Sequence, residues 1–173
     1  HMVKPEVGDY IAAAWHRFPL GITVISSLNS DGSIHGLSTE RAMTVSLEPP
    51  MVLFYLGRKK GTYENIMREK RFGMNILGAD QLQWSEYFST KPLSPDRPGN
   101  LETAPSGMPL IEDCIASMDC KLVHMIPTGV NTNHGLTGPG FMVIGEVTDM
   151  EVKDGFPLIF MEGSYLAVVA GPE

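Results

Sequence analysis

Cysteine is scarce in this chain, and its scarcity excludes a fold held together by disulfides. The 173 residues include only Cys114 and Cys120, too few for the framework of bridges that stabilises small secreted domains. Their separation of six positions matches no common metal-binding spacing. We interpret both as ordinary core thiols, with redox activity as the less favoured alternative.

Long apolar runs and an excess of positive charge are also absent. No run reaches the length of a membrane-spanning helix, and the N-terminus lacks the basic-then-apolar pattern of a signal peptide, which predicts a cytoplasmic protein. A net charge of −7 argues against a general nucleic-acid surface. A local basic cluster could still bind an anionic small ligand. His1 before Met2 resembles a cloning remnant and is left out of the fold prediction.

The sequence also lacks the common catalytic and nucleotide-binding motifs. It has no GxSxG elbow, no HExxH pair, no GxxxxGK[ST] loop and no dinucleotide-binding fingerprint. These absences argue against hydrolytic, metal-dependent and nucleoside-triphosphate chemistry, and we predict no metal site. His35 and His124 fall in predicted strands and are interpreted as core or edge residues. His134 falls in a glycine-rich loop, from which its side chain could reach a ligand.

The remaining pattern predicts a mainly β fold in a single domain over residues 1–173. Short connections favour antiparallel pairing, in two packed sheets or a closed barrel, with a few peripheral helices. Gly145 is expected at a bulge or close approach. Residues 90–108 are predicted to form a long loop. Loops of this length are usually functional lids or oligomer contacts. Periodicity predicts helices at 5–18, 63–68 and 79–89, and strands at 21–27, 34–37, 45–47, 51–56, 72–77, 115–126, 141–152, 158–161 and 165–170.

A polar interruption marks the stretch from Ser33 to Leu56, SIHGLSTERAMTVSLEPPMVLFYL. Residues 38–44 carry hydroxyls and charges where a buried strand would carry Val or Ile. Two interpretations follow. Either this is a solvated edge strand, or it lines a ligand that needs hydrogen bonds.

A basic turn follows the apolar strand 51–56. Arg58, Lys59 and Lys60 precede a predicted short helix for which Thr62 is the expected N-cap. Cations next to unpaired helix amides make a good phosphate site. The alternative is a solvated surface turn.

Taken in order, these segments resemble the flavin reductase-like family of FMN-binding split-barrel proteins. The resemblance rests on GITVIS, DGSIHGLS, TVSLEPPMVLF, GTYENI and FGMNIL, with GMPLIEDCIASMDCKL and FMVIGEV further on. It spans about residues 12–152. It implies an antiparallel, Greek-key-like split β-barrel that forms a homodimer and binds FMN, or less often FAD, near the dimer interface.

The resemblance also assigns roles to individual residues. Arg41 would lie near the ring, where a cation favours the reduced flavin. His134 would substitute as the catalytic histidine for the Gly-Asp-His that many relatives carry before the GEV strand. The residues expected to line the flavin ring and its chain are Ser38, Thr39, Glu40, Ala42 and Thr44. The residues expected at its phosphate are Arg58, Lys59, Lys60 and Thr62.

The function implied is that of an NAD(P)H-dependent flavin reductase, with NADH or NADPH as donor and a flavin-dependent monooxygenase as partner. The alternative is a non-reductase FMN-binding flavoprotein or electron carrier of the same fold, which the altered Gly-Asp-His region favours. Glu40-Arg41 is a second departure, because relatives carry small or uncharged residues there. A carboxylate beside the flavin would disfavour its anionic reduced form unless Arg41 pairs with it.

Overall fold

Seven antiparallel strands form the main sheet of the protein. The computed structural model describes residues 6–128, 131–132, 135–136, 140–168 and 171–172. The strand order is β3-β2-β6-β9-β12-β5-β4, and every neighbouring pair is antiparallel. The mainly β, antiparallel fold class is therefore confirmed. The strands are β2 (Thr23–Leu28), β3 (Ile34–Thr39), β4 (Ala42–Leu47), β5 (Pro50–Leu56), β6 (Arg71–Ile76), β9 (Ala116–Pro127) and β12 (Phe141–Val152).

The sheet curls until its two edges meet. The edge strands β3 and β4 are consecutive in the chain, and only Glu40 and Arg41 join them. That link spans at most about 11 Å, whereas the edges of a flat seven-stranded sheet would lie roughly 29 Å apart. The polar stretch 38–44 is thus not one interrupted strand. It is the end of β3, a bend, and the start of β4.

Smaller elements surround this sheet. β1 (Leu20–Gly21), β13 (Ile159–Met161) and β14 (Ser164–Leu166) form one small sheet, and β7 (Leu101–Thr103) pairs with β8 (Pro109–Ile111). β10 (Asn131–Thr132) pairs with β11 (Gly135–Leu136) within residues 127–140, the glycine-rich stretch predicted as a loop. The described residues form three helices, as predicted: α1 (Glu6–His16), α2 (Lys60–Glu69) and α3 (Leu82–Ser89). In the described part of the chain, no helix has the length and apolar character needed to cross a membrane.

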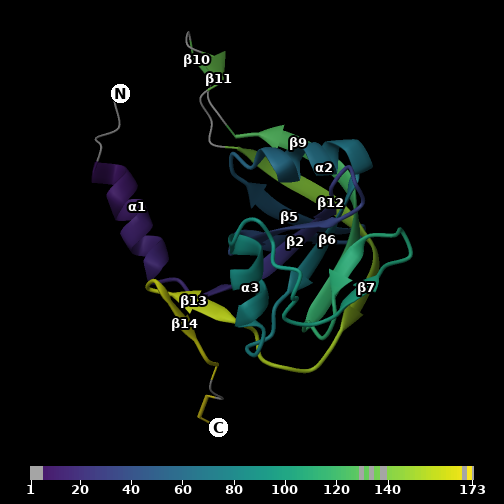
Figure 1. Ribbon diagram of the computed structural model, residues 1–173. Helices are drawn as coiled ribbons and strands as arrows, with labels where there is room; N and C mark the ends of the chain where they lie inside the picture. The colour runs from purple at the N-terminus through teal and green to yellow at the C-terminus, as the bar shows by residue number, and fades with distance from the viewer. Residues whose placement is uncertain (1–5, 129–130, 133–134, 137–139, 169–170, 173) are drawn as a thin grey trace.

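The helices differ in how closely they pack. Figure 1 shows α2 and α3 close to the main sheet, whereas α1 stands apart beside β13 and β14. Ile66 of α2 is buried in the cluster around Phe54 and Phe72. Trp84 and Phe88 of α3 are buried in a second cluster. Two of the three helices are therefore fixed to the sheet by the core.

Close packing explains two of the sequence interpretations. The β9–β12 register shifts between Ile144 and Gly145, and a Cβ at Gly145 would lie 2.5 Å from the Phe72 ring. The expected bulge and close approach at Gly145 are both confirmed. Cys114 and Cys120 are free and buried, and burial raises the pKa of each thiol to about 12. They are core thiols, because the reactive thiolate is suppressed near neutral pH.

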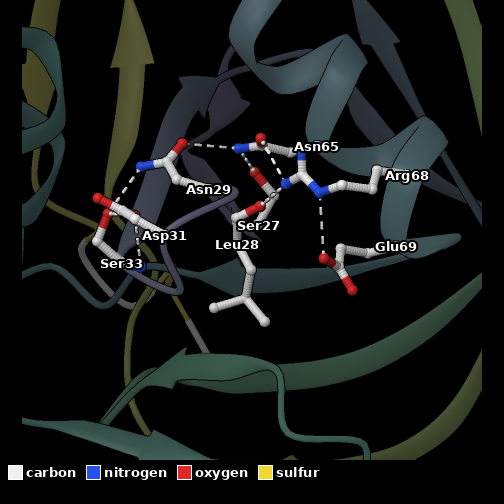
Figure 2. A network of polar contacts seen from close by, with 8 residues as sticks. All are labelled: Ser27, Leu28, Asn29, Asp31, Ser33, Asn65, Arg68 and Glu69. Carbon is white, nitrogen blue, oxygen red and sulfur yellow. Dashed lines mark hydrogen bonds and ion pairs between the residues drawn. The ribbon is translucent and has the colours of Figure 1, made fainter.

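A polar network holds α2 against the first hairpin (Figure 2). The Asn65 side-chain amide donates to Ser27 Oγ at 3.2 Å and to Asn29 Oδ1 at 2.9 Å. Arg68 donates to the Leu28 carbonyl at 2.6 Å and to Asn65 Oδ1 at 3.0 Å. Asn65 is 4 % exposed, so its polar atoms need these partners. The network fixes α2 against the end of β2 and the turn that follows it.

Candidate functional site

The N-terminus of α2 has the features expected of an anion site. The helix begins at Lys60, and Lys59 occupies the N-cap position without a side-chain capping bond; no acidic residue lies in the first turn. The first amides of a helix have no intrahelical acceptor, and the helix dipole adds positive potential there. The predicted N-cap role of Thr62 is wrong. Thr62 lies inside the helix, buried, with Oγ1 2.9 Å from His35 Nε2.

Four cations line a cavity of about 450 Å³ at this helix end, which we call the helix cavity. Three were expected there: Arg58, Lys59 and Lys60. The fourth is Lys91, from the loop after α3, and burial lowers the pKa of its ammonium group. Lys91 could not be predicted as a site residue, because nothing in the chain pattern places it near α2. The full lining is His35, Gly36, Leu37, Ser38, Arg58, Lys59, Lys60, Gly61, Thr62, Phe88, Ser89 and Lys91.

His35 forms a wall of the helix cavity, beneath the first turn of α2. A Cβ at Gly61 would lie 3.3 Å from His35 Cε1, so glycine lets the turn approach the imidazole closely. Burial is the main cause that lowers the pKa of His35, and the positive charge of Lys91 adds to it. The interpretation of His35 as a core or edge residue was incomplete. The sequence feature that could have indicated a site role for His35 is the adjacent Gly36, which together with His35 forms the HG motif.

The lowered pKa of His35 predicts that the stability of the protein depends on pH. Its folded-state pKa lies below the ordinary 6.5, so the unfolded chain binds this proton more readily. We expect the free energy of unfolding to fall as the pH drops below about 6.5. His35→Gln should reduce the difference between urea unfolding curves at about pH 7.5 and about pH 5.5. An unchanged difference would show that His35 does not contribute to it.

A second cavity of about 320 Å³ surrounds the bend between β3 and β4; we call it the bend cavity. Ser38 Oγ lies 2.7 Å from Ser85 Oγ of α3. The Arg41 guanidinium lies over the Tyr55 ring, 5.3 Å from its centroid, a distance typical of a cation–π contact. The ion pairs among the described residues do not include Glu40 with Arg41. The lining is Leu37, Ser38, Thr39, Glu40, Arg41, Tyr55, Gly57 and Lys59.

The two cavities adjoin, since Leu37, Ser38 and Lys59 line both. Together they collect most of the residues expected at a ligand: Ser38, Thr39, Glu40, Arg41, Arg58, Lys59, Lys60 and Thr62. Thr44 lines neither cavity. It is exposed on β4, with Oγ1 3.4 Å from the Met51 carbonyl oxygen. His134 lies outside the described residues, so its expected catalytic role stays a prediction.

An apolar groove of about 840 Å³ lies beside the bend cavity, between α1 and the strands β4, β5 and β13. Glu40, Arg41 and Tyr55 line both the groove and the bend cavity, and Ala42 lines the groove alone. The wall of the groove that α1 forms is strongly apolar. It is nevertheless open to solvent, since Trp15 is 55 % exposed. An apolar face left open on this scale is typical of a protein–protein contact.

Comparison with known proteins identifies the family. The sequence profile described as "Flavin reductase like domain" matches residues 15–168. A Rhodococcus sp. protein, "NADH-dependent flavin reductase", is 29 % identical over 166 residues, covering 94 % of this chain and 88 % of the relative. The reductase component of the "FADH2-dependent resorcinol hydroxylase" of Rhizobium sp. (strain MTP-10005) is 29 % identical over 171 residues, covering 95 % and 90 %.

A solved structure agrees with this match. The structure titled "Flavin reductase PheA2 in native state" superposes with a TM-score of 0.78 at 30 % sequence identity, covering 94 % of this chain and 98 % of that one. Sequence and fold thus agree over nearly the whole chain. The chain belongs to the flavin reductase like domain family.

Proposed function

We propose that this protein is an NAD(P)H:flavin oxidoreductase that binds FMN or FAD in the joined bend and helix cavities. One observation carries the proposal. The bend cavity, which has hydroxyl and charged side chains in its lining, adjoins a cavity with four cations at the N-terminus of α2. A flavin nucleotide has the same two-part chemistry, because a flat ring with hydrogen-bonding edges is linked to a phosphate. The family match supports the same activity.

The residues present fit such a ligand. The phosphate would bind at the first amides of α2, with Arg58, Lys59 and Lys91 around it. The ring would lie along residues 38–41, where Ser38 and Thr39 offer hydroxyl groups. The polar stretch of the sequence then has a physical reason, since the ring edge needs donors and acceptors.

When bound, the flavin supplies the chemistry by accepting a hydride from the nicotinamide. The protein binds and orients, and hydride transfer itself requires no side chain that gains or loses a proton. The positive charge of Arg41, held over Tyr55, favours negative charge on a ring in the bend cavity. The negative charge of Glu40 disfavours negative charge on the ring, and the positive charge of Arg41 offsets this effect. A role for His134 in nicotinamide binding stays a prediction.

The proposal extends to assembly. We infer that residues 1–173 form one domain, that the curled sheet is a split barrel, and that two copies form a homodimer through the apolar groove. On α1, Tyr10 is 75 % exposed and Trp15 is 55 % exposed. Exposure of these large apolar side chains to water is unfavourable, and contact with a second copy would bury them. The groove shares residues with the bend cavity, so the flavin would lie next to the dimer contact.

A flavin-dependent monooxygenase is the partner we propose, because the similar Rhizobium protein is named as the reductase component of a hydroxylase. Reduced flavin would pass from this protein to the oxygenase. A cytoplasmic location stays a prediction.

Anaerobic stopped-flow spectroscopy tests the activity. Protein loaded with FMN is mixed with NADH or with NADPH, and the flavin absorbance at about 450 nm is followed. We expect rapid bleaching that saturates with one of the two nucleotides. A bound flavin that neither nucleotide bleaches would contradict the reductase and favour the electron-carrier alternative. Failure to bind FMN or FAD at all would overturn the flavin site itself.

A further inference from the structure

The first turn of α2 is tied to β3 by one polar contact. Thr62 is the third residue of the helix, and its buried Oγ1 lies 2.9 Å from Nε2 of His35. Among the described residues, no other side-chain hydrogen bond or ion pair links residues 60–62 to another element. The bond can form with either tautomer of the imidazole, because a hydroxyl group both donates and accepts.

The strand side of this contact is held independently of the helix. His35 pairs with Ser27 in the β2–β3 ladder, and Ser27 Oγ accepts from Asn65, about one turn further along α2. The backbone of Gly61 lies against the imidazole, where a Cβ would be 3.3 Å from Cε1. β3 is therefore fixed by the sheet, whereas the first turn of α2 depends on its contact with His35.

The contact is important because the helix has no side-chain cap. Lys59 makes no capping bond, and no acidic residue lies in the first turn. A first turn without a cap frays readily, and its amide groups then lose their common direction. The residues of this turn line the helix cavity. The bond between His35 and Thr62 therefore supplies the restraint that a capping side chain would otherwise give.

We propose that His35 is a positioning residue for the phosphate of the flavin nucleotide. It holds Thr62, and through Thr62 it keeps the first amides of α2 directed at the helix cavity, without a contact of its own to the phosphate. This inference rests on the proposed function. It also gives Thr62 a different role from the one expected at the phosphate, because its hydroxyl group is engaged with His35.

The charge of His35 agrees with this role. Burial, and after it the positive charge of Lys91, lowers the pKa of the imidazole, so the ring is uncharged at about pH 7.5. A neutral ring is a weaker partner for a phosphate than the cations Arg58 and Lys59 beside it. It is nevertheless a full hydrogen-bond partner for a hydroxyl group. The cations therefore supply charge at this site, and His35 supplies geometry.

The test compares dissociation constants of FMN and of riboflavin, which lacks the phosphate, in His35→Leu, Thr62→Val and the double variant. We expect each single change to weaken FMN by about fivefold, the loss of roughly one hydrogen bond, while riboflavin changes by less than about twofold. The double variant should lose no more than either single variant, because both changes remove the same contact. His124 is an exposed histidine of β9 that lines neither cavity, so His124→Leu is the matched control and should change neither ligand.

A conservative variant separates positioning from direct binding. The side-chain amide of His35→Gln can still bond to the hydroxyl group of Thr62, so we expect its FMN affinity to stay within about twofold of the unaltered protein. A loss as large as in His35→Leu, again confined to FMN, would show that the imidazole itself contacts the phosphate. That result would overturn the inference.

The remaining outcomes are equally distinct. Unchanged FMN affinity in His35→Leu would overturn the inference, and so would equal losses for FMN and riboflavin, which indicate the ring site or a folding defect. Losses that add in the double variant would show that His35 and Thr62 act separately. All of these results leave the proposed function intact, whereas failure of the unaltered protein to bind FMN or FAD would overturn the proposed function.

Discussion

Replacing Arg58, Lys59 and Lys60 together by alanine is expected to raise the dissociation constant for FMN well over tenfold. Each charge-assisted contact to a phosphate contributes roughly 1.5–3 kcal/mol. All three residues are solvent-exposed, and Lys60 is partly engaged with Glu64 at 3.8 Å, so the full sum is not expected. The helix amides and Lys91 remain in the variant. The variant should therefore keep some affinity for FMN.

Riboflavin is the control ligand for this triple variant, because it has the ring of FMN without the phosphate. Its affinity should change by less than about twofold, since the three side chains act on charge. Fluorescence titration with FMN and with riboflavin measures both. An unchanged FMN affinity would place the phosphate elsewhere. Equal losses for both ligands would point to the ring site or to a folding defect instead.

The second large effect is expected in the centre of the sheet, at Asp119 of β9. Asp119 is 1 % exposed, and its carboxylate accepts from the Arg71 guanidinium at 3.1 Å and from Ser106 Oγ at 2.8 Å. It thus joins the neighbouring strands β6 and β9 to the turn before β8. Removing one partner of a buried pair leaves the other charge without compensation, which is strongly destabilising.

Asp119→Ala should therefore lower the free energy of unfolding by about 3 kcal/mol, at the lower end of the range for buried pairs. The lower end applies because the Arg71 side chain is 26 % exposed and keeps some contact with water. Urea unfolding measures the change. Glu64→Ala, which removes the exposed pair with Lys60, is the matched control and should cost less than about 0.5 kcal/mol. A loss at Asp119 no larger than this control would show that the pair adds little stability.

These predictions separate binding from folding. The triple variant alters exposed residues at the end of α2, and we expect its stability to stay close to that of the unaltered protein. Asp119 lines neither the bend cavity nor the helix cavity, and we expect Asp119→Ala to keep its FMN affinity while it is folded. The residues of the proposed site therefore differ from the buried residues, such as Asp119, that stabilise the sheet.

Local sequence patterns were sufficient for the class of fold. Alternation and β-branched runs located the strands of the main sheet, and local patterns likewise located the three helices, because these signals depend on neighbours in the chain. The run of cations at residues 58–60 likewise marked one end of the site. The predicted start of the second helix was wrong. The hydroxyl of Thr62 suggested a cap, but burial against His35 places that residue inside α2.

The contacts between residues far apart in the chain could not be predicted from the sequence. Lys91 joins Arg58 and Lys59 only because α3 packs on β3 through Phe88; a Cβ at Gly36 would lie 2.3 Å from that ring. The residues 38–41 line a cavity because the sheet curls and brings its edges together. Local patterns specify which segments become strands and helices, since these depend on nearby residues. The closure of the sheet and the packing of its helices depend on long-range burial, so only the tertiary structure decided which charges and hydroxyls meet.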